Sequence, residues 1–216
     1  MGIPGRNANA DPKEMTAEFA QTIKAHLEES ARVKLASRDL CTEPLLRAVA
    51  LVRESLERGG KVMFCGNGGS AADSQHLAAE FTSLLRQDFP RPGLSAIALT
   101  TDTSFLTANA NDFGFEGAFE RLTQAIGRAG DVLVGISTSG NSRNVMRAFE
   151  EARKMAIKTV AFTGISGGKM GELADVVIKV PSSKVQHIQE THIAFGHLLC
   201  QLVEESLFPN NSQVHS

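Results

Sequence analysis

The sequence predicts an α/β protein in which a five-stranded parallel sheet is sandwiched between helices. From about residue 61 onward, short apolar runs alternate with amphipathic segments, which is the pattern of repeated strand–helix units. Runs such as 132–134 and 176–178 are continuously apolar, as parallel strands buried on both faces require. The 216 residues are enough for one sizeable core, so we expect a single domain over 15–208.

Two helices are expected before the first strand. Between Met15 and about Arg58, apolar residues recur at helical spacing. Thr42-Glu43-Pro44 has the hydroxyl residue and the proline that are typical of a helix start, so we place the beginning of the second helix there. Residues 1–14 carry Gly, Pro and Asn without periodicity and are expected to form a disordered leader.

Five strands and a last helix are expected after residue 58. The apolar runs place the strands at residues 61–65, 95–99, 131–136, 159–163 and 175–180. A final amphipathic helix is expected over about 188–207, because Pro209 cannot continue a helix. Residues 209–216 are polar and are expected to form a flexible tail.

Composition argues against several classes of function. Lys and Arg total 22 against 24 Asp and Glu, without a long run of either sign, which disfavours nucleic-acid and anionic-membrane partners. No segment approaches the ~20 apolar residues of a membrane span, and the N-terminus lacks the apolar core of a signal peptide. The three cysteines are widely separated, which indicates a reducing compartment rather than a disulfide framework. We therefore expect a cytoplasmic protein with a small neutral or anionic ligand.

The first of three glycine- or hydroxyl-rich turns is Cys65-Gly66-Asn67-Gly68-Gly69-Ser70. In an open parallel sheet, ligands bind beyond the carboxyl ends of the strands, where turns expose backbone N–H groups. The glycines let the backbone approach a ligand, although they would also serve a plain tight turn. Asn67 and Ser70 add polar reach that favours binding. The spacing fits neither the dinucleotide motif nor the Walker motif.

The second turn, Ser137-Thr138-Ser139-Gly140-Asn141-Ser142, predicts a phosphate site. It lies between an apolar strand and a helix, so its four hydroxyl groups join the free N–H donors of a helix N-terminus. A capping cluster is the alternative, but one hydroxyl suffices for a cap and four exceed that need. The third turn, 163–168, has fewer side-chain donors and is interpreted as structural.

Two helices carry candidate catalytic groups. His76 and Glu80 are four residues apart, so one helix face presents an imidazole and a carboxylate that can share a substrate proton or a metal ion. Such pairs also occur on solvated faces. In the last helix, Gln189 and His197 lie about 12 Å apart along the axis. They meet only if long side chains converge or if different subunits supply them, and a core or interface histidine is the alternative.

Five segments resemble those of the phosphoheptose isomerases, a family with the sugar isomerase (SIS) fold, and the resemblance covers roughly residues 15–208. The segments are CGNGGSAADSQHLAAEF (65–81), TTDTSFLTANANDFGFE (100–116), GDVLVGISTSGNSRNV (130–145), FTGISGGKM (162–170) and HIQETHIAFGH (187–197). The resemblance implies a flavodoxin-like fold and a homotetramer, with the N-terminal helices used for oligomer packing. It also implies conversion of sedoheptulose 7-phosphate into D-glycero-D-manno-heptose 7-phosphate, the first step of heptose biosynthesis for lipopolysaccharide or capsule.

The same resemblance implies roles for individual residues. Glu80 would be the general base and His197 the opposing acid/base of an aldose–ketose isomerisation through an enediolate. One zinc ion per subunit would polarise the carbonyl. The implied zinc ligands are His76, Glu80, Gln189 and His197. The implied substrate-binding residues are Asn67, Gly68, Gly69, Ser70, Asn111, Asp112, Ser137, Thr138, Ser139, Ser142 and Gln189.

Two positions depart from the family pattern. Relatives often carry an arginine where this chain has Leu84, and Arg86 is the candidate to supply that substrate contact instead. Relatives also often carry Lys or Arg at the position of His187, which would alter local charge and pH dependence.

Two other functions fit the same fold. A non-catalytic SIS protein that associates with the replication initiator DnaA has a similar C-terminal segment, LCQLVEESLFP in this chain. That family as a rule lacks the catalytic pair, whereas Glu80 and His197 are both present here. An SIS isomerase or sensor of another sugar phosphate is the third possibility, because a phosphate turn reports the anion and not the carbon skeleton.

Overall fold

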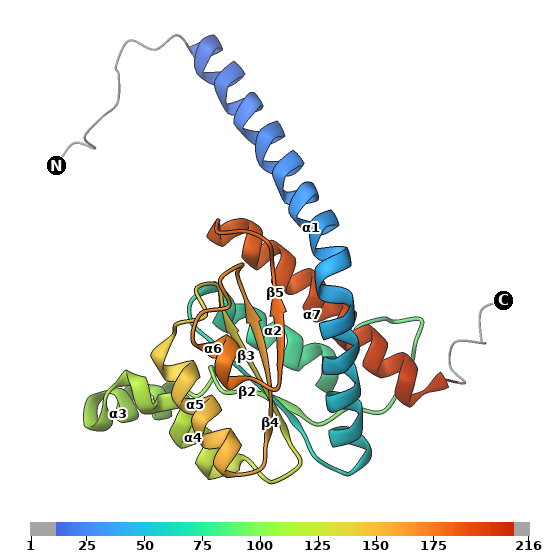
Figure 1. The fold of residues 1–216 in the computed structure, drawn as a ribbon, viewed down its shortest axis with the longest axis vertical. Helices are drawn as coiled ribbons and strands as arrows, with labels where there is room; N and C mark the ends of the chain where they lie inside the picture. Colours follow the sequence, from blue (N-terminus) through green and yellow to red (C-terminus); the bar gives the residue numbers. More distant parts are fainter. Residues whose placement is uncertain (1–11, 210–216) are drawn as a thin grey trace.

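The computed structural model describes residues 12–209, with the side chains of 15–209. Its strands form one sheet in the order β2-β1-β3-β4-β5, and every neighbouring pair is parallel (Figure 1). The strands are β1 (Val62–Gly66), β2 (Ala96–Ala98), β3 (Val132–Ser137), β4 (Lys158–Thr163) and β5 (Val176–Lys179). They coincide with the five expected apolar runs. The predicted α/β class is confirmed, and the strand order is that of flavodoxin-like sheets.

Helices cover both faces of the sheet. They are α1 (Pro12–Glu57), α2 (Gly69–Thr82), α3 (Thr103–Phe113), α4 (Ala118–Ile126), α5 (Arg143–Lys154), α6 (Met170–Leu173) and α7 (Val185–Leu207), with a 3-10 turn at Phe115–Gly117. One core packs α1, α2 and α7 against the sheet, and a second packs α4, α5 and α6 against the opposite face. Alternate β1 residues divide between the two cores, since Phe64 enters the first and Met63 the second.

The expected break at Pro44 is wrong, because α1 is one helix of 46 residues that passes through the proline. Proline costs an interior helix one backbone hydrogen bond, which packing on both sides of Pro44 offsets. A stripe of buried residues runs unbroken along α1 at spacings of three and four. Its members are Ser30, Val33, Ser37, Cys41, Leu45, Ala48 and Val52. Near the proline, Cys41 Sγ donates to the carbonyl oxygen of Lys179 at 3.3 Å and so ties α1 to β5.

The N-terminal part of α1 extends beyond the sheet and α7 (Figure 1). Its apolar residues Phe19, Ile23 and Leu27 are 57%, 60% and 63% exposed. The helix begins at Pro12, three residues before the expected domain start. Residues 1–11 and 210–216, which make up most of the predicted leader and tail, lie outside the described residues. No described helix is long and apolar enough to cross a membrane.

A buried ion pair fixes the end of α2 against α7. The side chains of Arg91 and Glu204 are both 0% exposed, and Arg91 Nε donates to Glu204 Oε1 at 2.7 Å. The same guanidinium donates to the backbone carbonyl oxygens of Glu80 at 2.7 Å and Phe81 at 2.9 Å. These are carbonyls of the last turn of α2, which lack partners inside the helix. The loop after α2 thus supplies the cap of that helix.

The three cysteines are free and buried, as expected for a chain without a disulfide framework. Burial raises the pKa of the Cys65 and Cys200 thiols, and that of Cys41 to about 11. Each thiol therefore stays protonated and packs as a small apolar side chain.

Candidate active site

The sheet order brings the first two turns together. The strand order reverses between β1 and β3, because β2 follows on one side and β4 and β5 on the other. Ligands of doubly wound sheets bind at this point, beyond the carboxyl ends of the two strands. The glycine turn follows β1 and the hydroxyl turn follows β3, so both predicted ligand turns lie there.

A reciprocal amide pair joins the two turns. Asn67 Nδ2 donates to Asn144 Oδ1 at 3.0 Å, and Asn144 Nδ2 donates back to Asn67 Oδ1 at 2.9 Å. Asn144 is buried and belongs to the first turn of α5, directly after the hydroxyl turn. Sequence reasoning missed Asn144. The available signal was a second asparagine at the helix start, since a buried amide requires partners.

The hydroxyl turn gathers three serine side chains at the N-terminus of α5. Ser137 Oγ is 2.8 Å from Ser142 Oγ and 3.4 Å from Ser139 Oγ. Ser139 Oγ also accepts a hydrogen bond from the backbone N–H of Asn141 at 3.1 Å. Ser142 is the N-cap residue, yet its side chain caps no backbone N–H among the described residues. This argues against the capping alternative and leaves helix donors and hydroxyls for an anion.

The third turn, residues 163–168, packs against the hydroxyl turn and hydrogen-bonds to it, in agreement with its interpretation as a structural element. Gly140 has φ +65°, and a Cβ there would lie 2.1 Å from the carbonyl oxygen of Gly167. The backbone N–H of Met170 donates to the Gly140 carbonyl at 2.9 Å, and that of Gly164 donates to the Thr138 carbonyl at 3.0 Å. The two turns are therefore tied together by backbone hydrogen bonds and close packing.

A depression of about 210 Å³ opens beside the two turns. Its lining residues are Asn67, Phe115, Glu116, Ser142, Arg143 and Asn144. Arg143 Nη1 donates to Glu116 Oε1 at 2.9 Å, and the arginine side chain is 74% exposed. Sequence reasoning also missed this guanidinium, which sits one residue after the hydroxyl turn and suits an anionic ligand.

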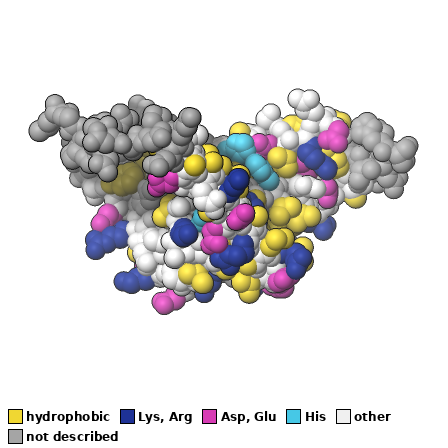
Figure 2. Space-filling model, turned by 90° about the horizontal axis from the view of Figure 1, so that it is seen from above, with side chains coloured by type: hydrophobic (Ala, Val, Ile, Leu, Met, Phe, Trp, Pro, Cys, Tyr) yellow, Lys and Arg dark blue, Asp and Glu magenta, His cyan; other side chains and the backbone are white. Residues whose placement is uncertain are grey.

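His76 and Glu80 of α2 come together with His197 of α7. His76 Nε2 lies 3.2 Å from Glu80 Oε1 and 2.8 Å from His197 Nε2. The Glu80 side chain is only 18% exposed, whereas that of His76 is 49% exposed. At the carboxyl end of the sheet, histidine side chains form an exposed patch (Figure 2). The pairing of Glu80 with His197 expected from two helices therefore occurs within one chain.

The three residues suit a divalent metal ion. Their donor atoms lie within 4.8 Å of one another, and two imidazoles with one carboxylate form a usual zinc donor set. Asp73, one turn before His76 on α2, has a carboxylate oxygen without a hydrogen-bond partner among the described residues. Burial raises the pKa of Asp73, and the charge of His76 opposes this. Asp73 is a second carboxyl beside the cluster that sequence reasoning missed.

Gln189, the fourth implied zinc ligand, lies over the glycine turn. A Cβ on Gly69 would approach Gln189 Nε2 to 2.6 Å, so the amide occupies the space that a side chain at position 69 would fill. Gly69 opens α2, the helix that carries His76 and Glu80. Gln189 thus lies against the glycine turn, on the same helix α7 that carries His197.

Three other predicted residues are placed apart from this cluster. Asn111 Nδ2 donates to Asp112 Oδ1 at 2.8 Å, and both side chains are exposed at the end of α3. Arg86, the candidate replacement for the arginine missing at Leu84, lies 3.2 Å from Glu205 and over the ring of Phe89. Its charge is therefore engaged near the C-terminal end of α7, about two turns after His197.

Comparison with known proteins identifies the same family as the motifs do. The SIS domain model matches residues 25–164. A phosphoheptose isomerase of Aneurinibacillus thermoaerophilus is 50% identical over 192 residues, which cover 87% of this chain and 95% of the relative. The phosphoheptose isomerase of Burkholderia pseudomallei strain 1710b is 51% identical, with coverage of 86% and 94%.

Solved structures agree with these relatives. The phosphoheptose isomerase of Neisseria gonorrhoeae superposes with a TM-score of 0.82 at 44% identity, over 87% of this chain and 99% of that one. The enzyme of Francisella tularensis gives a TM-score of 0.83 at 34% identity, with coverage of 87% and 98%. By sequence identity over most of its length and by fold, this chain belongs to the phosphoheptose isomerase family of SIS-domain proteins.

Proposed function

We propose that the chain catalyses the isomerisation of sedoheptulose 7-phosphate to D-glycero-D-manno-heptose 7-phosphate. The observation that carries the proposal is the meeting of Glu80 and His197 between α2 and α7, on a sheet whose switch point carries a hydroxyl-rich turn of the phosphate-binding type. In this reading the hydroxyl turn and the N-terminus of α5 hold the phosphate. The product would supply heptose for lipopolysaccharide or capsule in the cytoplasm.

The reaction needs one group that takes a proton and another that handles the oxygens. Glu80, a sheltered carboxylate, removes the proton from the carbon beside the carbonyl and returns it to the neighbouring carbon. His197 donates a proton to the carbonyl oxygen and accepts one from the adjacent hydroxyl, so the enediolate forms and collapses without net change in protons. His76, in contact with both groups, orients them.

His76, Glu80 and His197 would hold a zinc ion, with Gln189 as the implied fourth ligand. When bound, zinc supplies Lewis-acid polarisation of the substrate carbonyl. The Nε2 atoms of His76 and His197 lie 2.8 Å apart, and both imidazoles would be ligands of the ion.

The experiment that tests the proposal is turnover of sedoheptulose 7-phosphate by purified protein, with and without added zinc. Glu80→Gln and His197→Ala are expected to lower kcat at least ~100-fold, because each removes a general acid/base. Glu57→Gln, an exposed carboxylate at the end of α1, is the matched control and should keep full activity. A well-folded wild-type protein that binds the sugar phosphate without turnover would support the sugar-phosphate sensor instead. Tight binding to DnaA without turnover would support the non-catalytic SIS protein.

A homotetramer is the proposed assembly. The exposed apolar residues Phe19, Ile23 and Leu27 on the projecting part of α1 support it, since they lack cover from the described part of their own chain. Light scattering of the full chain and of Ile23→Glu tests this: we expect a tetramer for the first and smaller species for the second.

A further inference from the structure

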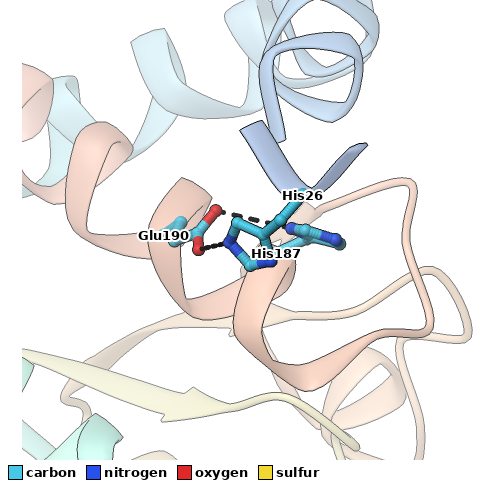
Figure 3. Close-up of side chains that lie close together, drawn as sticks. All are labelled: His26, His187 and Glu190. Atoms are coloured by element: carbon cyan, nitrogen blue, oxygen red, sulfur yellow. Dashed lines mark hydrogen bonds and ion pairs between the residues drawn. The ribbon is translucent and has the colours of Figure 1, made fainter. Parts of the chain in front are cut away.

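A second cluster of potential metal ligands lies between α1 and α7, apart from the catalytic groups. It consists of His26 from α1 and of His187 and Glu190 from α7 (Figure 3). His26 Nε2 lies 2.7 Å from Glu190 Oε1, and His187 Nδ1 lies 3.5 Å from Glu190 Oε2. The two imidazole rings are 4.5 Å apart between centroids. Two imidazoles therefore converge on the two oxygens of one carboxylate.

We propose that His26, His187 and Glu190 bind a second divalent cation, with zinc the best match to this donor set. Three protein ligands of nitrogen and carboxylate type, with the fourth position open, are a recurrent zinc arrangement. All three donor atoms already lie within 4.8 Å of one another. A bound ion requires ligand separations of about 3.3 Å. Retreat of His26 by roughly half an ångström from its hydrogen bond reaches that value, and its 38% exposed side chain can make the shift.

The surroundings orient the carboxylate as outer-shell groups do around metal ligands. Ser30 Oγ donates to Glu190 Oε2 at 2.5 Å, from one turn further along α1 than His26. His187 is 2% exposed, so its ring is held by packing and its position is fixed before an ion arrives. Preformed ligands of this kind lower the ordering cost of binding.

One neighbouring charge opposes a cation. Lys34 Nζ lies 3.8 Å from Glu190 Oε2 and 2.5 Å from Ser30 Oγ. The lysine side chain is 41% exposed, so it can swing into solvent when an ion takes its place. The opposing interpretation is a plain hydrogen-bond network in which Lys34 and the histidines neutralise Glu190. The two interpretations differ in the number of metal ions that the chain binds.

The second site is separate from the catalytic one. Glu190 follows Gln189 directly, but consecutive helix residues point about 100° apart. Gln189 accordingly faces Gly69 of α2, while Glu190 faces His26 of α1. Toward the N-terminus from His26, the described side chains 15–25 are all exposed. An ion here would fasten α1 to α7 at the point where α1 leaves the body of the protein.

Metal counting on the full chain tests the proposal. The protein is stripped with a chelator, loaded with zinc, desalted and measured by elemental mass spectrometry; cobalt loading is read by visible absorption. His26→Ala, which keeps a good helix former at a partly buried site, should bind about one ion per chain fewer than wild type. Lys24→Ala on the same helix is the matched control and should bind as many as wild type.

His76→Ala separates the two sites. This variant removes only the catalytic cluster, so zinc should still raise its melting temperature, and adding His26→Ala should abolish that rise. Affinity at the second site should fall more than ~100-fold in His26→Ala while isomerase activity is retained. Equal zinc content in wild type and His26→Ala would overturn the proposal whatever the activity of either protein. So would a zinc-induced rise in melting temperature that persists in the double variant.

Discussion

Replacing Arg91 by methionine tests the role of the buried ion pair at the end of α2. The substitution keeps an unbranched apolar stem but leaves the fully buried carboxylate of Glu204 without its counter-ion. Breaking such a pair costs about 3–5 kcal/mol. It also removes the donor to the carbonyl of Glu80, a loss of about 1–3 kcal/mol for a buried group, whereas the Phe81 carbonyl keeps the backbone N–H of Leu94 at 2.9 Å. We expect a total near 5 kcal/mol, so the melting temperature should fall by roughly 10–20 °C for a chain of this size.

The double variant separates these two terms. Arg91→Met with Glu204→Leu removes both charges, so the ion-pair cost should largely disappear while the carbonyl cost remains. The double variant should therefore be at least about 2 kcal/mol more stable than the sum of the single losses predicts. Urea unfolding followed by circular dichroism, at one fixed protein concentration, measures wild type, Arg91→Met, Glu204→Leu and the double variant.

Arg53→Met is the matched control, because Arg53 pairs with Glu57 on the surface of α1 with both side chains about half exposed. Its expected cost is below about 1 kcal/mol. If Arg91→Met costs no more than Arg53→Met, the buried pair does not hold α2. Losses in the double variant that simply add would refute the assignment of the cost to an unpaired charge. Should Arg91→Met fail to fold, Arg91→Lys, which retains the charge, is expected to fold with an intermediate loss.

Two further predictions concern the hydroxyl turn and the core of α7. Gly140→Ala puts a methyl group 2.1 Å from the carbonyl oxygen of Gly167, at a positive φ. We therefore expect at least about 2 kcal/mol of destabilisation, and weaker binding of inorganic phosphate measured by calorimetry. Unchanged phosphate affinity would contradict the idea that the third turn supports the hydroxyl turn. Burial lowers the pKa of His192 to about 4, although its hydrogen bond to the Thr163 carbonyl acts in the opposite direction. The unfolded chain therefore binds a proton at this histidine near pH 6.5, whereas the folded chain binds it only near pH 4. The stability that depends on neutral His192 is therefore fully present above pH 6.5 and declines toward pH 4. Between pH 7 and pH 5, the free energy of unfolding of wild type, measured in urea, should fall by about 2 kcal/mol more than that of His192→Gln. Parallel losses in the two proteins would exclude His192 as the cause.

The fold was predictable because its main signals are local. Continuously apolar runs identify buried parallel strands, and the turns after β1 and β3 carry their ligand chemistry in adjacent residues. Local signals also explain the wrong prediction at Pro44. The proline gives a local helix-start signal, but the continuous buried stripe of α1, which packs against α7 and β5, outweighs it. Counting that stripe from Ser30 through Val52 would have predicted one helix.

The parts of the site that escaped prediction depend on residues far apart in the sequence. Asn144 pairs with Asn67 across 77 positions, and Arg91 pairs with Glu204 across 113. Hydrophobic periodicity says nothing about such partners, because a buried polar side chain looks like a surface one in the sequence alone. The meeting of His26 with Glu190 is of this kind as well, across 164 positions. Only the fold reveals these pairs.

The continuity of α1 has a consequence for geometry. Forty-six residues of helix measure about 69 Å from end to end. Cys41 and Leu45, which flank Pro44, are both buried, so the one residue that could act as a hinge is clamped within the packed body. The projecting N-terminal part of α1 is therefore continuous with the segment that packs against the sheet, without a break at Pro44. A partner subunit that packs on Phe19, Ile23 and Leu27 would thus contact the same helix that lies against α7, the helix of His197.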